Sequence, residues 1–184
     1  MAKNKIVALV GMCGCGKSVV CDMFVKRGFE RIYFGGVTMD VLAERGLEKN
    51  EKNERAVREE LRRVHGPAAF AKLLLPKIDK ANEGGNTILD GLYSWSEYKC
   101  LKEHFGDDIT VVAIVADRKI RYERLTTREI RPLTNLEAES RDHSEIENLE
   151  KGGPIAIADK FIFNNGGIDE LEGQINDFID EITK

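Results

Sequence analysis

Long apolar runs, a basic surplus and paired cysteines are all missing from this sequence, and each absence excludes a class of protein. No stretch is long and apolar enough to cross a bilayer, which takes about 20 such residues. Lys and Arg number 28 against 32 Asp and Glu, which argues against a dedicated nucleic-acid binder. The first residues lead into a strand-like segment without the features of a signal peptide. We therefore expect a cytoplasmic protein without a membrane partner.

The four cysteines, Cys13, Cys15, Cys21 and Cys100, fit neither a zinc site nor a disulfide framework. The only close pair is separated by a single residue and has no nearby Cys or His partners. A chain of 184 residues without a secretion signal has no need of disulfides. We expect Cys21 and Cys100 to fill the core, as free cysteines usually do.

Apolar runs alternate with helical patterns along the chain, which is typical of βαβ units and a parallel sheet. The length suits one α/β domain with a proper core. The predicted strands are Ile6–Val10, Arg31–Phe34, Thr87–Leu89, Ile109–Val115 and Phe161–Phe163. The predicted helices include Glu51–Val64, Ala68–Lys80, Lys119–Thr127 and a C-terminal helix that packs on the sheet through Ile168, Leu171, Ile175, Phe178, Ile179 and Ile182. A turn is expected at 83–86, and the polar segment 128–153 has little strand character.

The strongest motif is the run Gly11-Met12-Cys13-Gly14-Cys15-Gly16-Lys17-Ser18. It matches the phosphate-binding pattern G-x-x-x-x-G-K-[ST] in full and lies between a predicted strand and a predicted helix, as the pattern requires. Glycines let backbone N–H groups turn toward phosphate oxygens, and the helix N-terminus adds a partial positive charge. We expect Lys17 to reach the β- and γ-phosphates of ATP and Ser18 to bind Mg²⁺. Cys13 and Cys15 lie at variable positions of a loop that opens a helix, which predicts sensitivity to oxidation.

A second carboxylate is expected at a neighbouring strand end, because ligands of parallel sheets bind beyond the carboxyl ends of the strands. Asp90 follows the predicted strand Thr87–Leu89 and is the best candidate to hold Mg²⁺ or to orient an acceptor. Asp117 follows the strand Ile109–Val115 and competes for this role. Since Gly91 follows Asp90, an ordinary turn is the alternative explanation.

Arginines gather after the predicted strand Ile109–Val115, at positions 121, 124, 128, 131 and 141. Arg124 and Arg128 are four residues apart and share a helix face. Guanidinium groups neutralise the charge that spreads over phosphate oxygens during phosphoryl transfer. A solvated charged face explains any one of these arginines alone, whereas their common place after a βα unit favours a functional cluster.

The whole chain resembles the nucleoside-monophosphate-kinase branch of P-loop kinases, including adenylate-kinase-related and dephospho-coenzyme-A-kinase-related proteins. The resemblance rests on Gly11–Ser18, on Glu123–Arg128 and on Ala158–Gly166. It implies an α/β fold, the P-loop NTPase three-layer α/β/α sandwich with a five-stranded parallel sheet, in one domain over residues 1–184. It also implies a helical acceptor-binding insert at about 35–83 and a lid at about 126–153.

The resemblance also implies roles for single residues. Arg124 would pack on the ATP base, Arg128 would contact phosphates, and Arg131 and Arg141 would be lid arginines that meet the transferred phosphate. Motif and resemblance together predict a nucleotide site made of Gly11, Cys13, Gly14, Cys15, Gly16, Lys17, Ser18, Val19, Arg124 and Asn165. They predict Lys17, Asp90, Arg128 and Arg131 as catalytic residues, and Ser18 and Asp90 as Mg²⁺ ligands.

Two positions depart from this family. Its members place an acceptor-phosphate arginine soon after the strand that ends at Asp90, where this chain has Leu92-Tyr93-Ser94-Trp95. They place a second arginine in the helix after strand two, near Met39. Either Arg45, Arg58 or Arg62 substitutes, or the acceptor is not an ordinary nucleoside monophosphate. Tyr93 and Trp95 either stack on the acceptor or pack beneath the insert.

The predicted function is phosphoryl transfer from ATP–Mg²⁺ to a small-molecule acceptor, with a nucleotide as the favoured class. A regulatory nucleotide-dependent NTPase without such an acceptor is the alternative, and the two missing arginines favour it. Against a GTPase switch, no Asn-Lys-x-Asp stretch follows a late strand. Action on nucleic-acid ends is a third hypothesis, which the acidic balance disfavours. The sequence does not indicate the oligomeric state.

Overall fold

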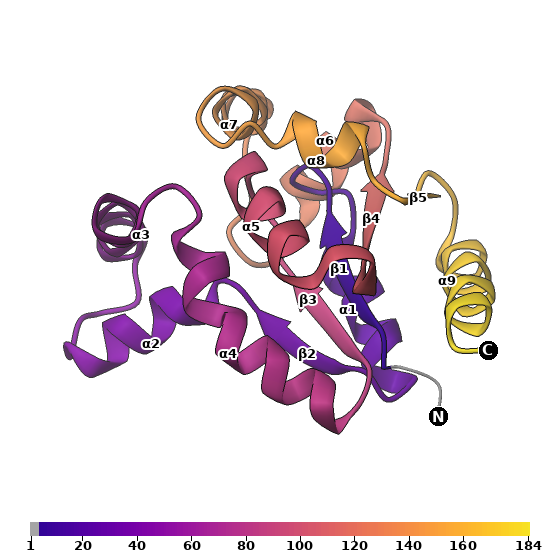
Figure 1. Cartoon of the computed structure of the whole chain (residues 1–184). Helices are drawn as coiled ribbons and strands as arrows, with labels where there is room; N and C mark the ends of the chain where they lie inside the picture. The colour runs from indigo at the N-terminus through magenta and orange to yellow at the C-terminus, as the bar shows by residue number, and fades with distance from the viewer. Residues whose placement is uncertain (1–3) are drawn as a thin grey trace.

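The computed structural model describes residues 4–184, apart from the side chain of Glu51, and centres on a parallel sheet (Figure 1). Its strands are β1 (Ile6–Val10), β2 (Glu30–Tyr33), β3 (Thr87–Asp90), β4 (Ile109–Val115) and β5 (Lys160–Phe163), in the order β2-β3-β1-β4-β5. All four pairings are parallel. The central strand β1 is buried along its whole length, which explains its unbroken apolar sequence.

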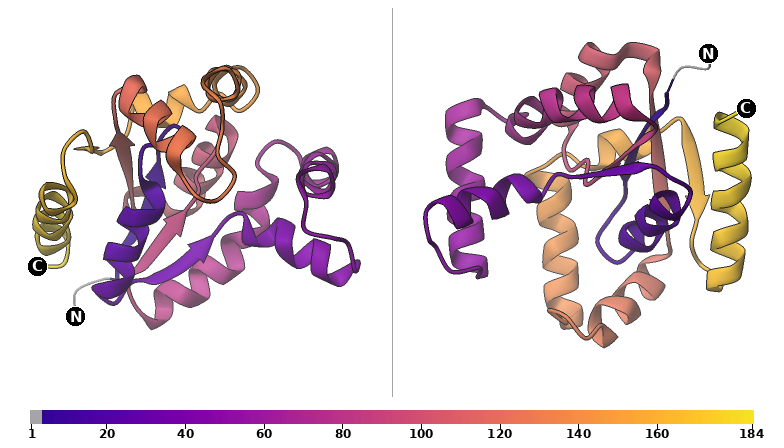
Figure 2. Two further views of the ribbon diagram at one scale, coloured as in Figure 1. Left: turned by 180° about the vertical axis from the view of Figure 1, so that it is seen from behind. Right: turned by 90° about the horizontal axis from the view of Figure 1, so that it is seen from below.

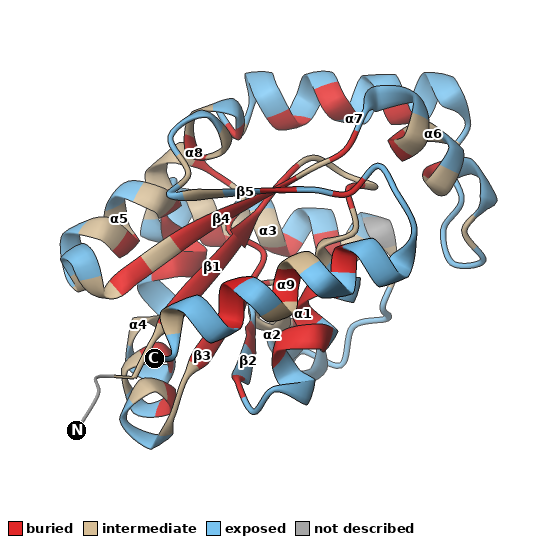
Figure 3. Ribbon diagram, turned by 90° about the vertical axis from the view of Figure 1, so that its right-hand side faces the viewer, coloured by how far each residue is buried: buried red, intermediate tan, exposed pale blue. Residues whose placement is uncertain are grey.

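Helices cover both faces of the sheet. On one face lie α1 (Lys17–Lys26) and α9 (Ile168–Ile182), and on the other lie α4 (Ala69–Gly84), α5 (Trp95–Phe105) and α8 (Gly152–Ala156). Alternate residues of β1 serve the two layers: Leu9 belongs to the core with Phe24 of α1, and Ala8 to the core with Ile78 of α4. The three central strands β3, β1 and β4 are almost wholly buried between these layers, whereas the edge strands β2 and β5 each bury only one residue (Figure 3). This arrangement confirms the predicted three-layer α/β/α sandwich of P-loop NTPases with five parallel strands.

Two helical segments extend beyond the carboxyl ends of the strands. One comprises α2 (Gly36–Glu44) and α3 (Glu51–His65), and the other comprises α6 (Arg118–Thr127) and α7 (Asn135–Glu147). Asn50 caps α3 by accepting the Asn53 N–H at 3.0 Å. In the right-hand view of Figure 2, α3 and α7 run in roughly the same direction, with a gap between their ribbons. A short 3₁₀ helix (Gly106–Asp108) leads into β4.

One local prediction was wrong, and one segment contains a helix that the sequence did not reveal. Instead of the expected turn at 83–86, α4 continues through Pro76 to Gly84, because Ile78 and Ala81 keep its buried face on the sheet. The polar segment 128–153 contains α7, whose buried residues are Ala138, Asp142 and Glu145. Two of these three are acidic, so the apolar pattern did not reveal the helix.

Core predictions at the ends of elements fare less well than those in their middles. Ile168 is 56% exposed, because it is the first residue of α9 and projects past the packed face of that helix. Leu171, Ile175, Phe178 and Ile179 are buried as predicted. Cys21 is fully buried, whereas Cys100 is only half-buried against the core. Within residues 4–184, no helix is both long enough and apolar enough to cross a membrane.

Candidate functional site

Residues 11–18 connect the end of β1 to the start of α1. Gly14 and Gly16 have left-handed backbone angles, with φ of 81° and 97°. A Cβ atom on Gly14 would come within 2.8 Å of the Arg121 carbonyl oxygen, and one on Gly16 would clash with Asn164 Nδ2. Backbone angle and close neighbours therefore both require glycine at these two positions.

Lys17 curls back over the loop. Its Nζ donates to the carbonyl oxygens of Gly11 at 2.6 Å and Met12 at 3.2 Å. Phosphate oxygens bound here would replace these carbonyls as partners of the ammonium group. The side chains of Ser18 and Val19 are exposed at the start of α1, so the Ser18 hydroxyl is accessible to a ligand.

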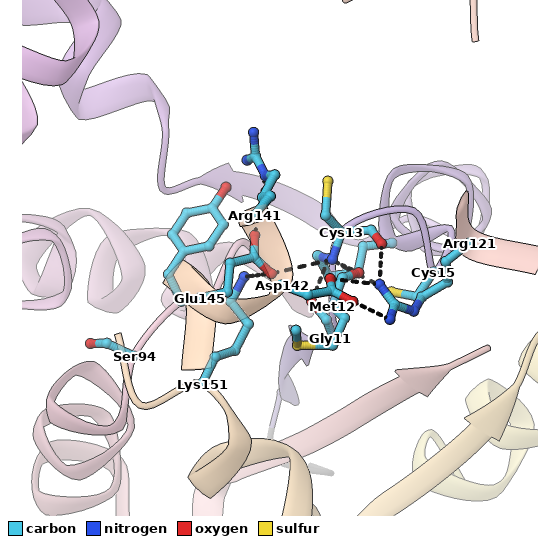
Figure 4. A network of polar contacts seen from close by, with 12 residues as sticks. Gly11, Met12, Cys13, Cys15, Ser94, Arg121, Arg141, Asp142, Glu145 and Lys151 are labelled. Carbon is cyan, nitrogen blue, oxygen red and sulfur yellow. Dashed lines mark hydrogen bonds and ion pairs between the residues drawn. The ribbon is translucent and has the colours of Figure 1, made fainter. Parts of the chain in front are cut away.

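An acidic side chain of α7 reaches the loop. Glu145 Oε2 accepts a hydrogen bond from the Cys13 N–H at 3.3 Å and lies 2.8 Å from Lys151 Nζ (Figure 4). Burial would raise the pKa of Glu145, but the charges of Lys151, Lys17 and Arg141 outweigh it and hold the pKa below its ordinary value. Burial lowers the pKa of Lys151, and Glu145 offsets this only in part. The carboxylate of Glu145 and the ammonium group of Lys151 therefore both lie beside the loop, and the sequence predicted neither of them.

Arg121 fixes α6, α7 and the loop to one another. Its guanidinium donates to both carboxylate oxygens of Asp142, at 2.8 and 2.6 Å, and to the carbonyl oxygen of Cys13 at 3.0 Å. Both side chains are buried. Burial alone would lower the pKa of Arg121, but the hydrogen bonds to Asp142 outweigh it and raise the pKa. This arginine of the predicted cluster therefore holds the loop through the Cys13 carbonyl oxygen and connects it to α7.

The loop after β5 also touches the phosphate loop, through Asn164. Asn164 Nδ2 donates to the carbonyl oxygen of Cys15 at 2.9 Å, and its Oδ1 accepts from Arg124 Nη2 at 3.3 Å. Asn165, the residue predicted for the nucleotide site, is exposed and exchanges two hydrogen bonds with Asp117, at 2.8 and 3.0 Å. Arg124 is thus brought to the loop as expected, and Asn164 rather than Asn165 connects them.

The other predicted arginines point to different partners. Arg128 Nε donates to the carbonyl oxygen of Arg131 at 2.7 Å, and Arg131 Nη2 donates to Glu54 of α3 at 2.8 Å. Arg131 has a left-handed φ of 54°. Arg141 Nε donates to Glu145 at 3.4 Å. Arg141 is thus linked to the phosphate loop through Glu145, whose carboxylate accepts the Cys13 N–H.

Asp90 lies at the end of β3, beside Leu9 of β1, and is buried. Its Oδ2 accepts two hydrogen bonds from Arg31, one of them from Nε at 3.1 Å, and Arg31 also pairs with Asp22 at 2.9 Å. Among the described residues, no three His, Cys, Asp or Glu side chains gather as a metal cage. Mg²⁺ held partly by nucleotide phosphates needs only one or two protein oxygens. Of the two predicted ligands, Ser18 has an exposed side chain, and Asp90 already pairs with Arg31.

The three arginines proposed as substitutes on the acceptor side have different partners. Of the three proposed substitutes, Arg45 pairs with Glu60 at 2.7 Å in an exposed position, and Arg58 pairs with Glu54 at 3.4 Å. Arg62 of α3 instead lies over the Phe70 ring, 5.1 Å from its centre, with its Nε buried. Burial lowers the pKa of Arg62, and the charge of Glu97 opposes this.

Glu97 is the buried acid opposite Arg62. It accepts the Tyr93 and Ser94 N–H groups at 2.8 and 3.1 Å, while its Oε1 has no hydrogen-bond partner among residues 4–184. Burial raises its pKa to about 7. The Ser94 hydroxyl caps α5 by accepting the Glu97 N–H at 3.1 Å, so this residue serves the helix.

The aromatic residues on this side divide between site and scaffold. Tyr93 is half-buried, and Lys151 Nζ lies 5.2 Å from the centre of its ring. Trp95 stacks on Tyr98 at 5.1 Å within α5, which favours packing for Trp95. Met39 packs against the core. Tyr93 therefore lies between the predicted acceptor side and Lys151.

Comparisons with known proteins agree with this arrangement. A family model described as an AAA domain (AAA_18) matches residues 7–150. A UPF0200 protein of Thermococcus kodakarensis is 34% identical over 181 residues, covering 96% of this chain and 97% of that relative. The chain belongs to the UPF0200 family.

Solved structures of low sequence identity share this fold. TT1252 from Thermus thermophilus has a TM-score of 0.70 at 17% identity, over 100% of both chains. Dephospho-CoA kinase from Campylobacter jejuni has a TM-score of 0.56 at 18% identity, over 98% of both chains. At these identities the likeness shows a P-loop kinase-like fold, and the chemistry rests on the residues themselves.

Proposed function

We propose that this chain transfers the γ-phosphoryl group of ATP to a small-molecule acceptor, with a nucleotide as the favoured acceptor class. The observation that carries the proposal is the loop Gly11–Ser18, which follows β1, opens α1 and holds Lys17 over its mouth. Loops of this shape bind nucleotide phosphates through backbone N–H groups. The kinase-like fold supports transfer as the chemistry that follows binding.

Each residue of the loop region then has a defined task. Lys17 exchanges the carbonyls of Gly11 and Met12 for phosphate oxygens and neutralises the charge that develops there. Ser18 and Asp90 are the residues that would hold Mg²⁺, which when bound neutralises charge on the β- and γ-phosphates. Asp90 also orients the acceptor hydroxyl and takes its proton, while Arg31 fixes the direction of the carboxylate.

The arginines of the α6–α7 segment act after a rearrangement. Arg131 is bonded to Glu54 of α3, so it must release that partner to meet the transferred phosphate. Arg128 is bonded to the backbone of Arg131 and moves with it. We propose that this segment closes over the loop and excludes water, as lids of phosphotransferases do. Arg124, next to Asn164, stays on the side of the ATP base.

The acceptor is proposed to bind between Arg62 and Tyr93. Arg62 is the arginine of the 35–83 segment that turns inward, and its buried Nε offers a donor for an anionic group. Tyr93 presents a ring close to Lys151, on which a base could stack. Arg62 would thus bind the anionic group that the family holds with arginines at the positions of Met39 and Ser94. Tyr93 would contact the base.

The decisive experiment is a screen for acceptor-stimulated ATP consumption. Nucleosides, nucleoside monophosphates and dephospho-coenzyme A are incubated with ATP and Mg²⁺, and phosphorylated products are identified by mass spectrometry. A product that is absent with a Lys17→Ala variant supports transfer. If no compound raises turnover above the level without acceptor, while ATP still binds, the proposal is wrong.

A regulatory NTPase is the second candidate function. It is favoured by the commitment of the Ser94 hydroxyl to the cap of α5 and by the packing of Met39 in the core, where the family holds acceptor phosphate. This candidate predicts nucleotide binding and slow hydrolysis that no small acceptor stimulates. The same screen therefore separates the two functions.

A further inference from the structure

Glu145 brings a negative charge to a loop whose backbone is arranged for anions. Its carboxylate accepts the N–H of Cys13, the third residue of the phosphate-binding motif, at 3.3 Å. Lys17 Nζ bonds to the carbonyl oxygen of Met12, the residue before Cys13, and its charge helps to lower the pKa of Glu145. In the phosphate-binding motif, this lysine reaches the β- and γ-phosphates. The side chain therefore lies at the terminal-phosphate end of the loop.

The position of Lys151 is fixed by the main chain as well as by its charge. Its backbone N–H donates to the carbonyl oxygen of Glu145 at 3.1 Å, which ends α7, and its Nζ lies 2.8 Å from Glu145 Oε2. Glu150, the residue before it, has a left-handed φ of 51° that turns the chain inward. Lys151 is only 1% exposed. A lysine held this deeply beside a phosphate loop is part of a built site.

We propose that Glu145 occupies the terminal-phosphate position of the loop, and that a bound triphosphate displaces it and takes over both Cys13 N–H and Lys151. Glu145 and Lys151 thereby select nucleotides by phosphate number. A diphosphate lacks the group that replaces the carboxylate, so it gains nothing from Lys151. Arg141, already bonded to Glu145 at 3.4 Å, receives the displaced carboxylate.

This inference rests on the nucleotide site of the proposed function and does not depend on transfer. It is tested by calorimetric binding of a non-hydrolysable ATP analogue and of ADP, each with Mg²⁺. Glu145→Gln keeps an oxygen acceptor but removes the competing charge, and it should raise affinity for the analogue about tenfold. Affinity for ADP should change less than threefold, and Glu139→Gln, on the exposed face of α7, should leave both unchanged.

Lys151 is tested in the Glu145→Gln background, so that no buried carboxylate is left without its counter-charge. Adding Lys151→Met should lower affinity for the analogue at least about tenfold with little change for ADP, and Lys151→Arg should restore it. An equal loss for both nucleotides would give Lys151 a merely structural role and overturn the proposal.

A crystal structure of the wild-type chain with the ATP analogue tests the displacement without substitution. Glu145 should have left the Cys13 N–H, and Lys151 should contact the terminal phosphate. A carboxylate still bonded to Cys13 beside a bound triphosphate overturns the inference. Binding selectivity without any phosphorylated acceptor would leave the inference standing and remove only the transfer function.

Discussion

The nucleotide side and the acceptor side of this molecule are built by different means. The nucleotide side is a backbone loop of eight residues, shaped by left-handed glycines and by one lysine. The proposed acceptor side is an assembly of side chains from α3, the loop after β3 and α5, namely Arg62, Tyr93 and Glu97. A backbone site can be recognised from a short motif, whereas a side-chain site depends on how distant helices pack.

The largest expected effect comes from the nucleotide side. Lys17→Ala removes the ammonium group that is proposed to bind phosphate oxygens, so turnover should fall by roughly 10³-fold or more. Acceptor-stimulated ATP consumption measures this. Lys26→Ala, at the exposed end of α1, should retain wild-type turnover. Comparable losses in both variants would mean that Lys17 acts through the stability of α1.

Asp90 is proposed to serve both sides, so its substitution tests whether nucleotide binding and catalysis can be separated. Asp90→Asn removes the proposed proton acceptor, so kcat should fall by about 10²–10³-fold while ATP affinity stays within about threefold. Asp117→Asn is the matched control, because Asp117 follows β4, the strand on the other side of β1, and is bonded to Asn165. A larger loss in the Asp117 variant would transfer the role to that residue.

Glu97 should make the acceptor side sensitive to pH. Burial raises its pKa to about 7, so the folded state holds a proton that the unfolded state releases between about pH 4.5 and 7. Stability should therefore fall as pH rises through this window. The free energy of unfolding of Glu97→Gln, minus that of the wild type, should increase by about 3 kcal/mol as the pH rises from about 4.5 to 8.

Denaturant titrations at several pH values measure this gain. Glu103→Gln, on the exposed part of the same helix, should follow the wild-type pH dependence. A Glu97→Gln protein that follows it as well would show that Glu97 is ionised throughout.

The smallest effect is expected from Arg62. Arg62→Met keeps the contact with Phe70 but removes the buried donor, so KM for the acceptor should rise about tenfold with KM for ATP within about twofold. Steady-state kinetics with the acceptor found in the screen measures both constants. Arg63→Met, the exposed neighbour, should change neither. An equal rise in both KM values would assign Arg62 to the scaffold.

The parts of the fold predicted from the sequence are those in which burial and local pattern agree. β1 and β4 read as continuous apolar runs because both faces of each strand are largely covered. The loop Gly11–Ser18 can be recognised from the sequence because its own backbone angles require its glycines. Helix α7 escaped prediction because two of its three buried residues are acids that pair with Arg121 and Lys151.

The site residues that were missed are mostly charges paired across long separations. Glu145 with Lys151, and Arg31 with Asp90, have no sequence pattern that announces them. Asn164 is different, because strand alternation could have revealed it. Along β5, Ile162 is buried and Phe163 exposed, so the next residue, Asn164, turns inward and Asn165 outward.

The glycine loop has a consequence for how the chain is made. Its contacts with Arg121, Glu145 and Asn164 span 108, 132 and 149 residues. During synthesis, α1 can form early, but the loop gains its full support only after β5 has left the ribosome and joined the sheet. The nucleotide site is therefore completed only when the last strand is in place.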